Sequence, residues 1–207
     1  MKKQITIVLL LITGLVAAQD QYTKGMQKAF ELWGQQKTNE AANLFERIAN
    51  VNTDNWLPYY YVAQINTIAA FQEKEKTVLK QKLDKAQEYI DLAKAISPEN
   101  PEIMVQQAMI YTAWVAFDGA TYGMTYSGKI IGIYAKAEVI APENPRVVFA
   151  KAEWDMGSAK YFKQDTTPFC KDIERSLELF TNFKPETPFH PNWGKERAEQ
   201  VAATCKN

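Results

Sequence analysis

The sequence is poor in the residues that build catalytic and metal sites. Its 207 residues include one histidine, His190, and two cysteines. Zinc and hydrolytic sites depend on histidine, and one such residue in a proline-rich turn does not supply a two-histidine site. Gly-x-Ser-x-Gly, His-Glu-x-x-His, phosphate-binding glycine loops and calcium loops are also missing. We therefore expect no enzyme activity, catalytic residue, metal site or cofactor, and His190 is expected to form hydrogen bonds within its turn.

An excess of charge of either sign is missing as well. Twenty-four Lys and Arg residues are balanced by 24 Asp and Glu residues, and they are scattered rather than gathered in a basic stripe. Binding to nucleic acid or to an anionic membrane surface depends on such an excess. We expect neither of these partners.

Long apolar runs are confined to the N-terminus. Lys2 and Lys3 precede an apolar stretch from Ile5 to Leu15, and the small residues Val-Ala-Ala follow at 16–18. This stretch is too short to span a bilayer, which favours a signal peptide over residues 1–18 against the alternative of a membrane anchor. We expect the mature chain, 19–207, to be secreted, most simply into the periplasm, as a single domain without stable membrane insertion.

Strand signals are nearly absent, and apolar residues instead recur with a helical period. The clearest set has alternating steps of four and three, which place its members on one helix face: Leu79, Leu83, Ala86, Ile90 and Ala93. The sequence therefore predicts an all-α protein.

A short motif occurs twice. Pro-Glu-Asn-Pro at 98–101 recurs at 142–145, 44 positions later, and each copy follows an Ala-Lys-Ala run that is typical of a helix end. A recurrence of this length is typical of stacked helical units. Each copy is expected to end one helix and begin the next.

The spacing within these units resembles that of the tetratricopeptide (TPR) repeat. Ala86, Ile90, Ala93 and Pro98 match its second helix, and residues 37–46 resemble its turn and second-helix start. The resemblance implies an α-solenoid of about four antiparallel helix hairpins, the last three longer than usual. Their expected bounds are near 22–55, 56–100, 101–144 and 145–187, followed by a capping helix over 192–206.

The entry to that capping helix carries a second resemblance. Residues 189–194, Phe-His-Pro-Asn-Trp-Gly, resemble a motif of secreted bacterial TPR-like proteins. We place the chain among them.

The two cysteines test the register of the C-terminal hairpin. Helices over 168–183 and 192–206, antiparallel around a turn near 187, would set Cys170 opposite Cys205. In an oxidising compartment this favours a disulfide between them, with two buried thiols as the alternative.

The TPR resemblance also implies a concave groove lined by first helices. Its groove positions fall on Tyr60, Gln64, Val105, Met109, Phe149 and Glu153. Such a lining suits an extended peptide or an apolar partner helix, although each aromatic residue is as consistent with core packing.

The glycine-rich stretch 117–129 is the least regular part of the chain. We expect it to be a turn between the two helices of the third unit. There Tyr122, Met124 and Tyr126 would either contact a ligand or fold back onto neighbouring helices.

These expectations favour a scaffold or adaptor that binds a protein or peptide in its groove. One alternative is a small-molecule-binding protein or enzyme that uses 117–129 and the His190 turn. The other is a structural envelope component without a groove ligand.

Overall fold

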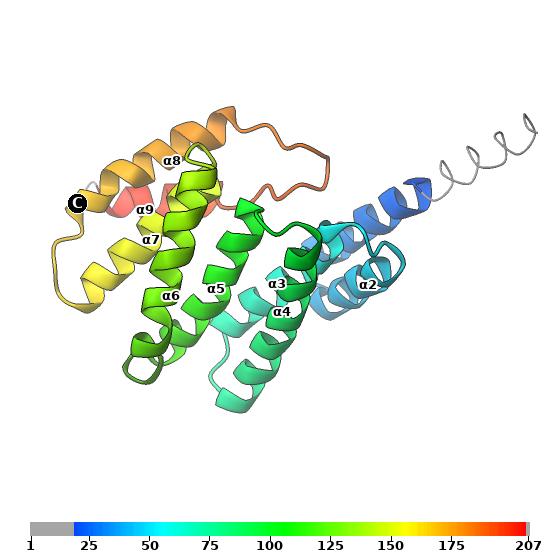
Figure 1. Ribbon diagram of the computed structural model, residues 1–207, viewed down its shortest axis with the longest axis horizontal. Coiled ribbons are helices and arrows are strands. Elements are labelled where there is room, and N and C mark those ends of the chain that lie inside the picture. Colours follow the sequence, from blue (N-terminus) through cyan, green and yellow to red (C-terminus); the bar gives the residue numbers. More distant parts are fainter. Residues whose placement is uncertain (1–18, 206–207) are drawn as a thin grey trace, which may run out of the picture.

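The computed structural model describes residues 19–205. The predicted signal peptide over 1–18 lies outside the described residues, as do 206 and 207. Within 19–205 the chain is mostly helical and contains no strand (Figure 1). No helix there is both long and apolar enough to cross a membrane.

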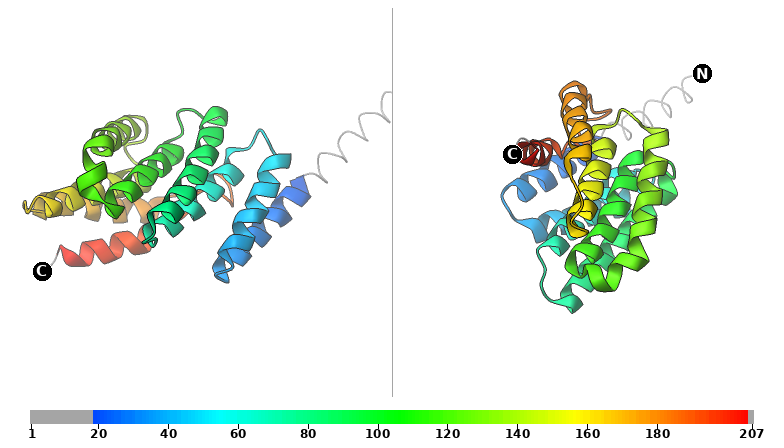
Figure 2. Two further views of the ribbon diagram at one scale, coloured as in Figure 1. Left: turned by 90° about the horizontal axis from the view of Figure 1, so that it is seen from below. Right: turned by 90° about the vertical axis from the view of Figure 1, so that its left-hand side faces the viewer.

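The helices follow one another as adjacent hairpins. The helix over 19–34 packs on α2, where Phe30 and Trp33 contact Phe45, and the later pairs are α3 with α4, α5 with α6, and α7 with α8. Figure 2 shows the pairs stacked along the long axis of the molecule. The predicted all-α solenoid of helix hairpins is confirmed. The bounds are α2 Thr38–Val51, α3 Trp56–Phe71, α4 Lys76–Ile96, α5 Pro101–Phe117, α6 Gly119–Ile140, α7 Pro145–Tyr161, η1 Thr167–Phe169, α8 Cys170–Asn182 and α9 Lys195–Thr204.

The repeated Pro-Glu-Asn-Pro motif starts two equivalent helices. Asn100 and Asn144 are N-caps whose side-chain oxygens accept hydrogen bonds from the backbone N–H groups of Glu102 and Arg146, both at 2.9 Å. A proline follows each cap at the first helical position, where its missing N–H costs no hydrogen bond. The motif therefore fixes where α5 and α7 begin.

The stretch 117–129 differs from the expected turn. Only Asp118 separates α5 from α6, and its carboxylate caps α6 by accepting a hydrogen bond from the N–H of Thr121 at 3.0 Å. The surplus residues of this unit lengthen its helices instead of the connection. The aromatic side chains of α6 hold it against α5, because Tyr126 stacks on Tyr111 with ring centroids 4.9 Å apart.

The capping helix α9 begins at Lys195, three residues later than expected. Gly194 precedes it with a φ of 106°, a left-handed conformation that glycine adopts without strain. Ala198, Val201 and Ala202 of α9 pack on Phe149 and on neighbours in α7 and α8. The helix covers the apolar end of the array, as a terminal helix must in a solenoid.

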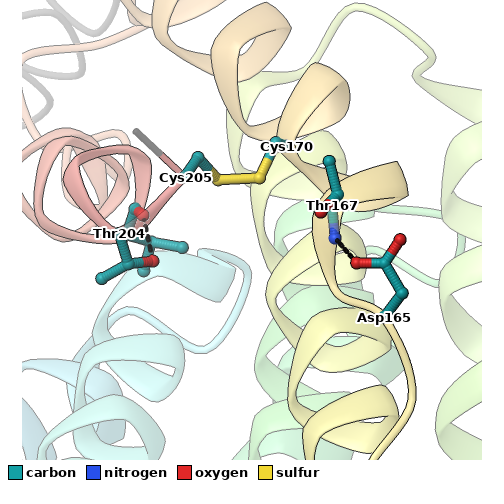
Figure 3. Close-up of a disulfide and its surroundings, with 6 residues drawn as sticks. Asp165, Thr167, Cys170, Thr204 and Cys205 are labelled. Atoms are coloured by element: carbon teal, nitrogen blue, oxygen red, sulfur yellow. Dashed lines mark hydrogen bonds between the residues drawn. A yellow bond between two sulfur atoms is a disulfide. The ribbon is translucent and has the colours of Figure 1, made fainter. Parts of the chain in front are cut away.

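A disulfide joins Cys170 to Cys205, as the hairpin register predicted (Figure 3). It ties the start of α8 to the residue after α9. The last two helices are therefore linked covalently at one end of the array.

Candidate functional site

A non-helical segment between α8 and α9, residues 183–194, crosses to the other end of the array. We call it the strap. Figure 1 shows it running from α8 toward the N-terminal helices and back. Phe189 lies against Tyr22 and Phe30, with ring centroids 5.8 and 6.0 Å apart, and its carbonyl oxygen accepts a hydrogen bond from the Tyr61 hydroxyl at 2.8 Å. The strap thus joins the last unit to the first.

The second half of the strap is anchored on α3. The indole Nε1–H of Trp193 donates to the Tyr60 hydroxyl at 2.8 Å. A Cβ atom on Gly194 would lie 2.9 Å from the Phe180 ring, so both the backbone conformation and the lack of space require glycine here. The strap is therefore held in place from Phe189 to Gly194.

A buried charge cluster lies against the strap. Arg146 pairs with Glu102 through two hydrogen bonds, from Nε at 2.6 Å and from Nη2 at 2.7 Å, and the exposed fractions of their side chains are 0% and 1%. Asn144 donates to the same carboxylate at 2.7 Å, and His190 Nε2 lies 3.7 Å from it. The guanidinium group stacks 4.3 Å above the Phe183 ring. Glu102 and Arg146 each follow a Pro-Glu-Asn-Pro motif directly, so the repeat places them in equivalent positions of adjacent units.

Burial and pairing set the protonation states of this cluster. Burial by itself would raise the pKa of Glu102, but the contacts with His190 and Arg146 outweigh it and hold that pKa below its ordinary value. Burial, together with the nearby Glu102 charge, raises the pKa values of Tyr60 and Tyr61. At neutral pH the carboxylate is therefore charged and both phenols are neutral.

A cavity of about 390 Å³ lies between the first helix, α3, α5 and the strap. Its α3 wall is built from Tyr61, Gln64 and Ile68, which share one helix face because they are three and four residues apart. The wall is mostly aromatic and apolar. The other lining residues are Phe30 and Trp33 of the first helix, Met109 of α5, and Pro188, His190, Asn192 and Trp193 of the strap.

The residues predicted to line a groove are divided between this cavity and covered surfaces. Gln64 and Met109 line the cavity. Tyr60 and Val105 are fully buried, and Phe149 is buried beneath α9. Glu153 accepts a hydrogen bond from Arg197 Nε of α9 at 2.7 Å. The C-terminal part of the chain itself thus covers most of the predicted groove.

The glycine-rich stretch 117–129 and His190 lie in different parts of the molecule. His190 lines the cavity, whereas no residue of 117–129 does. Tyr122 and Tyr126 are half-buried in an aromatic stack on α5, and Met124 is 98% exposed. Among residues 19–205 no group of three His, Cys, Asp or Glu side chains is placed to hold a metal ion.

Sequence reasoning missed most of the cavity wall. Nothing in the sequence distinguished Phe30, Trp33 and Tyr61 from aromatic residues that pack in the core. Trp193 fell within the capping helix expected over 192–206. The one available signal was the clustering of Phe189, His190 and Trp193 in a stretch without helical periodicity.

A solved structure shares this architecture. The HusA haemophore of Porphyromonas gingivalis superposes with a TM-score of 0.78 over 89% of this chain and 92% of that chain, at 22% sequence identity. A TPR protein of Thermus thermophilus gives a TM-score of 0.43 over 89% and 98%, at 12% identity. No protein-family model and no curated protein sequence matches the chain. The chain has a TPR-like helical fold.

Proposed function

We propose that this protein is an exported binding protein that acts without catalysis and carries an apolar, planar ligand of the porphyrin class in the cavity beneath the strap. The observation that carries the proposal is the aromatic cavity itself. Its volume, about 390 Å³, lies in the range of small-molecule sites. Flat aromatic walls favour a flat ligand, because rings stack in offset or edge-to-face contact.

The structural neighbour supports the choice of ligand class. HusA is a haemophore by name, and it shares this fold over nearly its whole length. The N-terminal sequence and the Cys170–Cys205 disulfide support export, because disulfides persist in oxidising compartments.

Iron coordination is not required by this proposal. His190 is the only histidine in the chain, and its Nε2 faces Glu102 rather than standing free. Its ring lies between those of Trp56 and Phe183, with centroids 5.9 Å from each. We therefore expect affinity to come from stacking, and metal-free protoporphyrin IX to bind within about tenfold of haem, a difference of about 1.4 kcal/mol.

Titration of tryptophan fluorescence with protoporphyrin IX and with haem tests the proposal. Ile68→Asp places a charge in the cavity wall, and Val78→Asp is its matched control on α4. The two side chains are exposed to similar extents, 39% and 37%, and Val78 does not line the cavity. We expect Ile68→Asp to weaken binding at least tenfold and Val78→Asp to leave it within twofold. Equal affinities for the two variants would contradict a ligand in this cavity.

A second candidate is a protein or peptide partner in the groove. The strap favours it, because a non-helical aromatic segment already lies on Tyr60 and Tyr61 there. A partner segment of similar composition would have to displace the strap.

A labelled peptide with the sequence of residues 183–194 tests this candidate by fluorescence anisotropy. Trp193→Ala removes the hydrogen bond to Tyr60 and loosens the strap, so the peptide should bind this variant more tightly than the wild type. Failure to bind either protein would count against a peptide groove.

A further inference from the structure

Gln64 is a buried polar side chain whose oxygen has no hydrogen-bond partner in the described part of the chain. It projects from the middle of α3 and is 2% exposed, and it lines the cavity. Its Oε1 atom is buried and accepts no hydrogen bond from any residue between 19 and 205. Burial of an amide is unfavourable unless its hydrogen bonds are made, so this position calls for a partner that those residues do not provide.

Gln106 shows what a structural glutamine looks like in the same core. It is fully buried on α5, and its Nε2 donates to the Thr67 hydroxyl at 2.8 Å. Gln106 does not line the cavity. Its Nε2 ties α5 to α3, although its Oε1, like that of Gln64, accepts no hydrogen bond within 19–205. Gln64 differs from it because Gln64 lines the cavity and has no side-chain bond to another helix among these residues.

The surroundings of Gln64 define what it can recognise. The α3 wall on either side of it is formed by Tyr61 and Ile68, and Asn192 of the strap adds a second amide to the lining. No Lys, Arg, Asp or Glu of the described residues lines the cavity. An amide both donates and accepts, and it presents either atom after rotation about its last bond.

We propose that Gln64 is a ligand-recognition residue, and that the ligand is amphipathic, with a flat apolar body and a polar substituent that hydrogen-bonds the Gln64 amide. Protoporphyrin IX carries carboxylic acid side groups of this kind, which are ionised at neutral pH and accept a hydrogen bond from Gln64 Nε2 when the rotated amide presents that atom to the ligand. The inference rests on the proposed function and adds to it the group by which the ligand is selected. In this role the unpaired Gln64 oxygen lowers the stability of the ligand-free protein, while the Gln64 amide makes ligand binding more selective.

The test compares protoporphyrin IX with its dimethyl ester, in which the acid groups are blocked, for wild type, Gln64→Leu and Gln106→Leu. We expect wild type to favour the acid at least tenfold. Gln64→Leu should bind acid and ester within about threefold of each other, and its melting temperature without ligand should equal or exceed that of wild type. Gln106→Leu should melt at a lower temperature and keep the wild-type preference.

Two results would overturn the inference in different ways. If wild type binds both compounds but Gln64→Leu keeps the acid preference, Gln64 is a core residue and the proposed function stands. If wild type binds neither compound, the proposed function fails and the inference fails with it. Gln64→Glu adds a check, because its carboxylate should repel the acid more than the ester.

Discussion

At the scale of single residues, the Glu102–Arg146 pair shows how a repeat can place charge in a core. Both residues follow the same four-residue motif, so stacking of adjacent units brings a carboxylate and a guanidinium group together beneath the strap. Such a pair gives little net stability relative to apolar residues, but either partner alone is an uncompensated buried charge.

Glu102→Ala should therefore destabilise the protein by about 3–5 kcal/mol, because it leaves Arg146 charged and unpaired. The double variant Glu102→Leu/Arg146→Met should recover most of that loss, since no buried charge remains at these two positions. Urea denaturation of the three proteins measures both effects. If Glu102→Ala lowers the free energy of unfolding by less than about 1 kcal/mol, water must reach the Arg146 side chain.

The same pair predicts how stability depends on pH. The pKa of Glu102 is lower in the folded protein than its ordinary value of 4.5, so its contribution is complete above about pH 5 and is lost as the pH falls through the folded pKa. Wild type should lose stability more steeply between about pH 5 and 3 than Glu102→Gln. Glu99→Gln is the control, because Glu99 is largely exposed, and it should keep the wild-type slope.

At the scale of helices, the two asparagine caps are alike in sequence and differ in their contacts. Asn100→Ala removes a cap and should cost about 1 kcal/mol. Asn144→Ala also removes a hydrogen bond to the buried Glu102, so it should cost roughly 1–2 kcal/mol more. Equal losses in thermal or urea unfolding would mean that the bond to Glu102 adds nothing.

The disulfide acts on α9 and the strap. Cys170→Ser/Cys205→Ser opens a loop with a sequence separation of 35 residues, and the chain-entropy account predicts a loss of about 3–4 kcal/mol. Amide exchange should rise most in α9, which packs on α7 and α8 at the end of the array. Uniform exchange across the molecule would show instead that α9 unfolds only with the whole domain.

At the scale of the whole molecule, the sequence predicts the array better than the site. Helix pairing follows from the TPR-like spacing of residues 86–98 and from the repeated motif, and the disulfide follows from antiparallel register. The strap could not be predicted in this way, because residues 183–194 have no periodicity and their contacts with Tyr22, Phe30 and Tyr61 are far away in sequence. The sequence also did not predict that α6 begins at Gly119. The three glycines of 117–129 indicated a turn there, although Asp118 caps a helix.

These features make one arrangement: the stacked helix hairpins form a wall, and the C-terminal strap forms the facing side of an aromatic cavity. The TPR-like fold supplies the wall, while four of the residues that line the cavity belong to the strap. A ligand held there would contact the first helix, α3 and the strap together. Binding should therefore order the strap more than any other part of the molecule.

Hydrogen–deuterium exchange of the whole chain, with and without saturating protoporphyrin IX, tests this claim most directly. We expect slower exchange in peptides that cover the strap and the part of α3 that lines the cavity, with α6 unchanged. Binding accompanied by protection on α6 alone, or by no change in the strap, would contradict it.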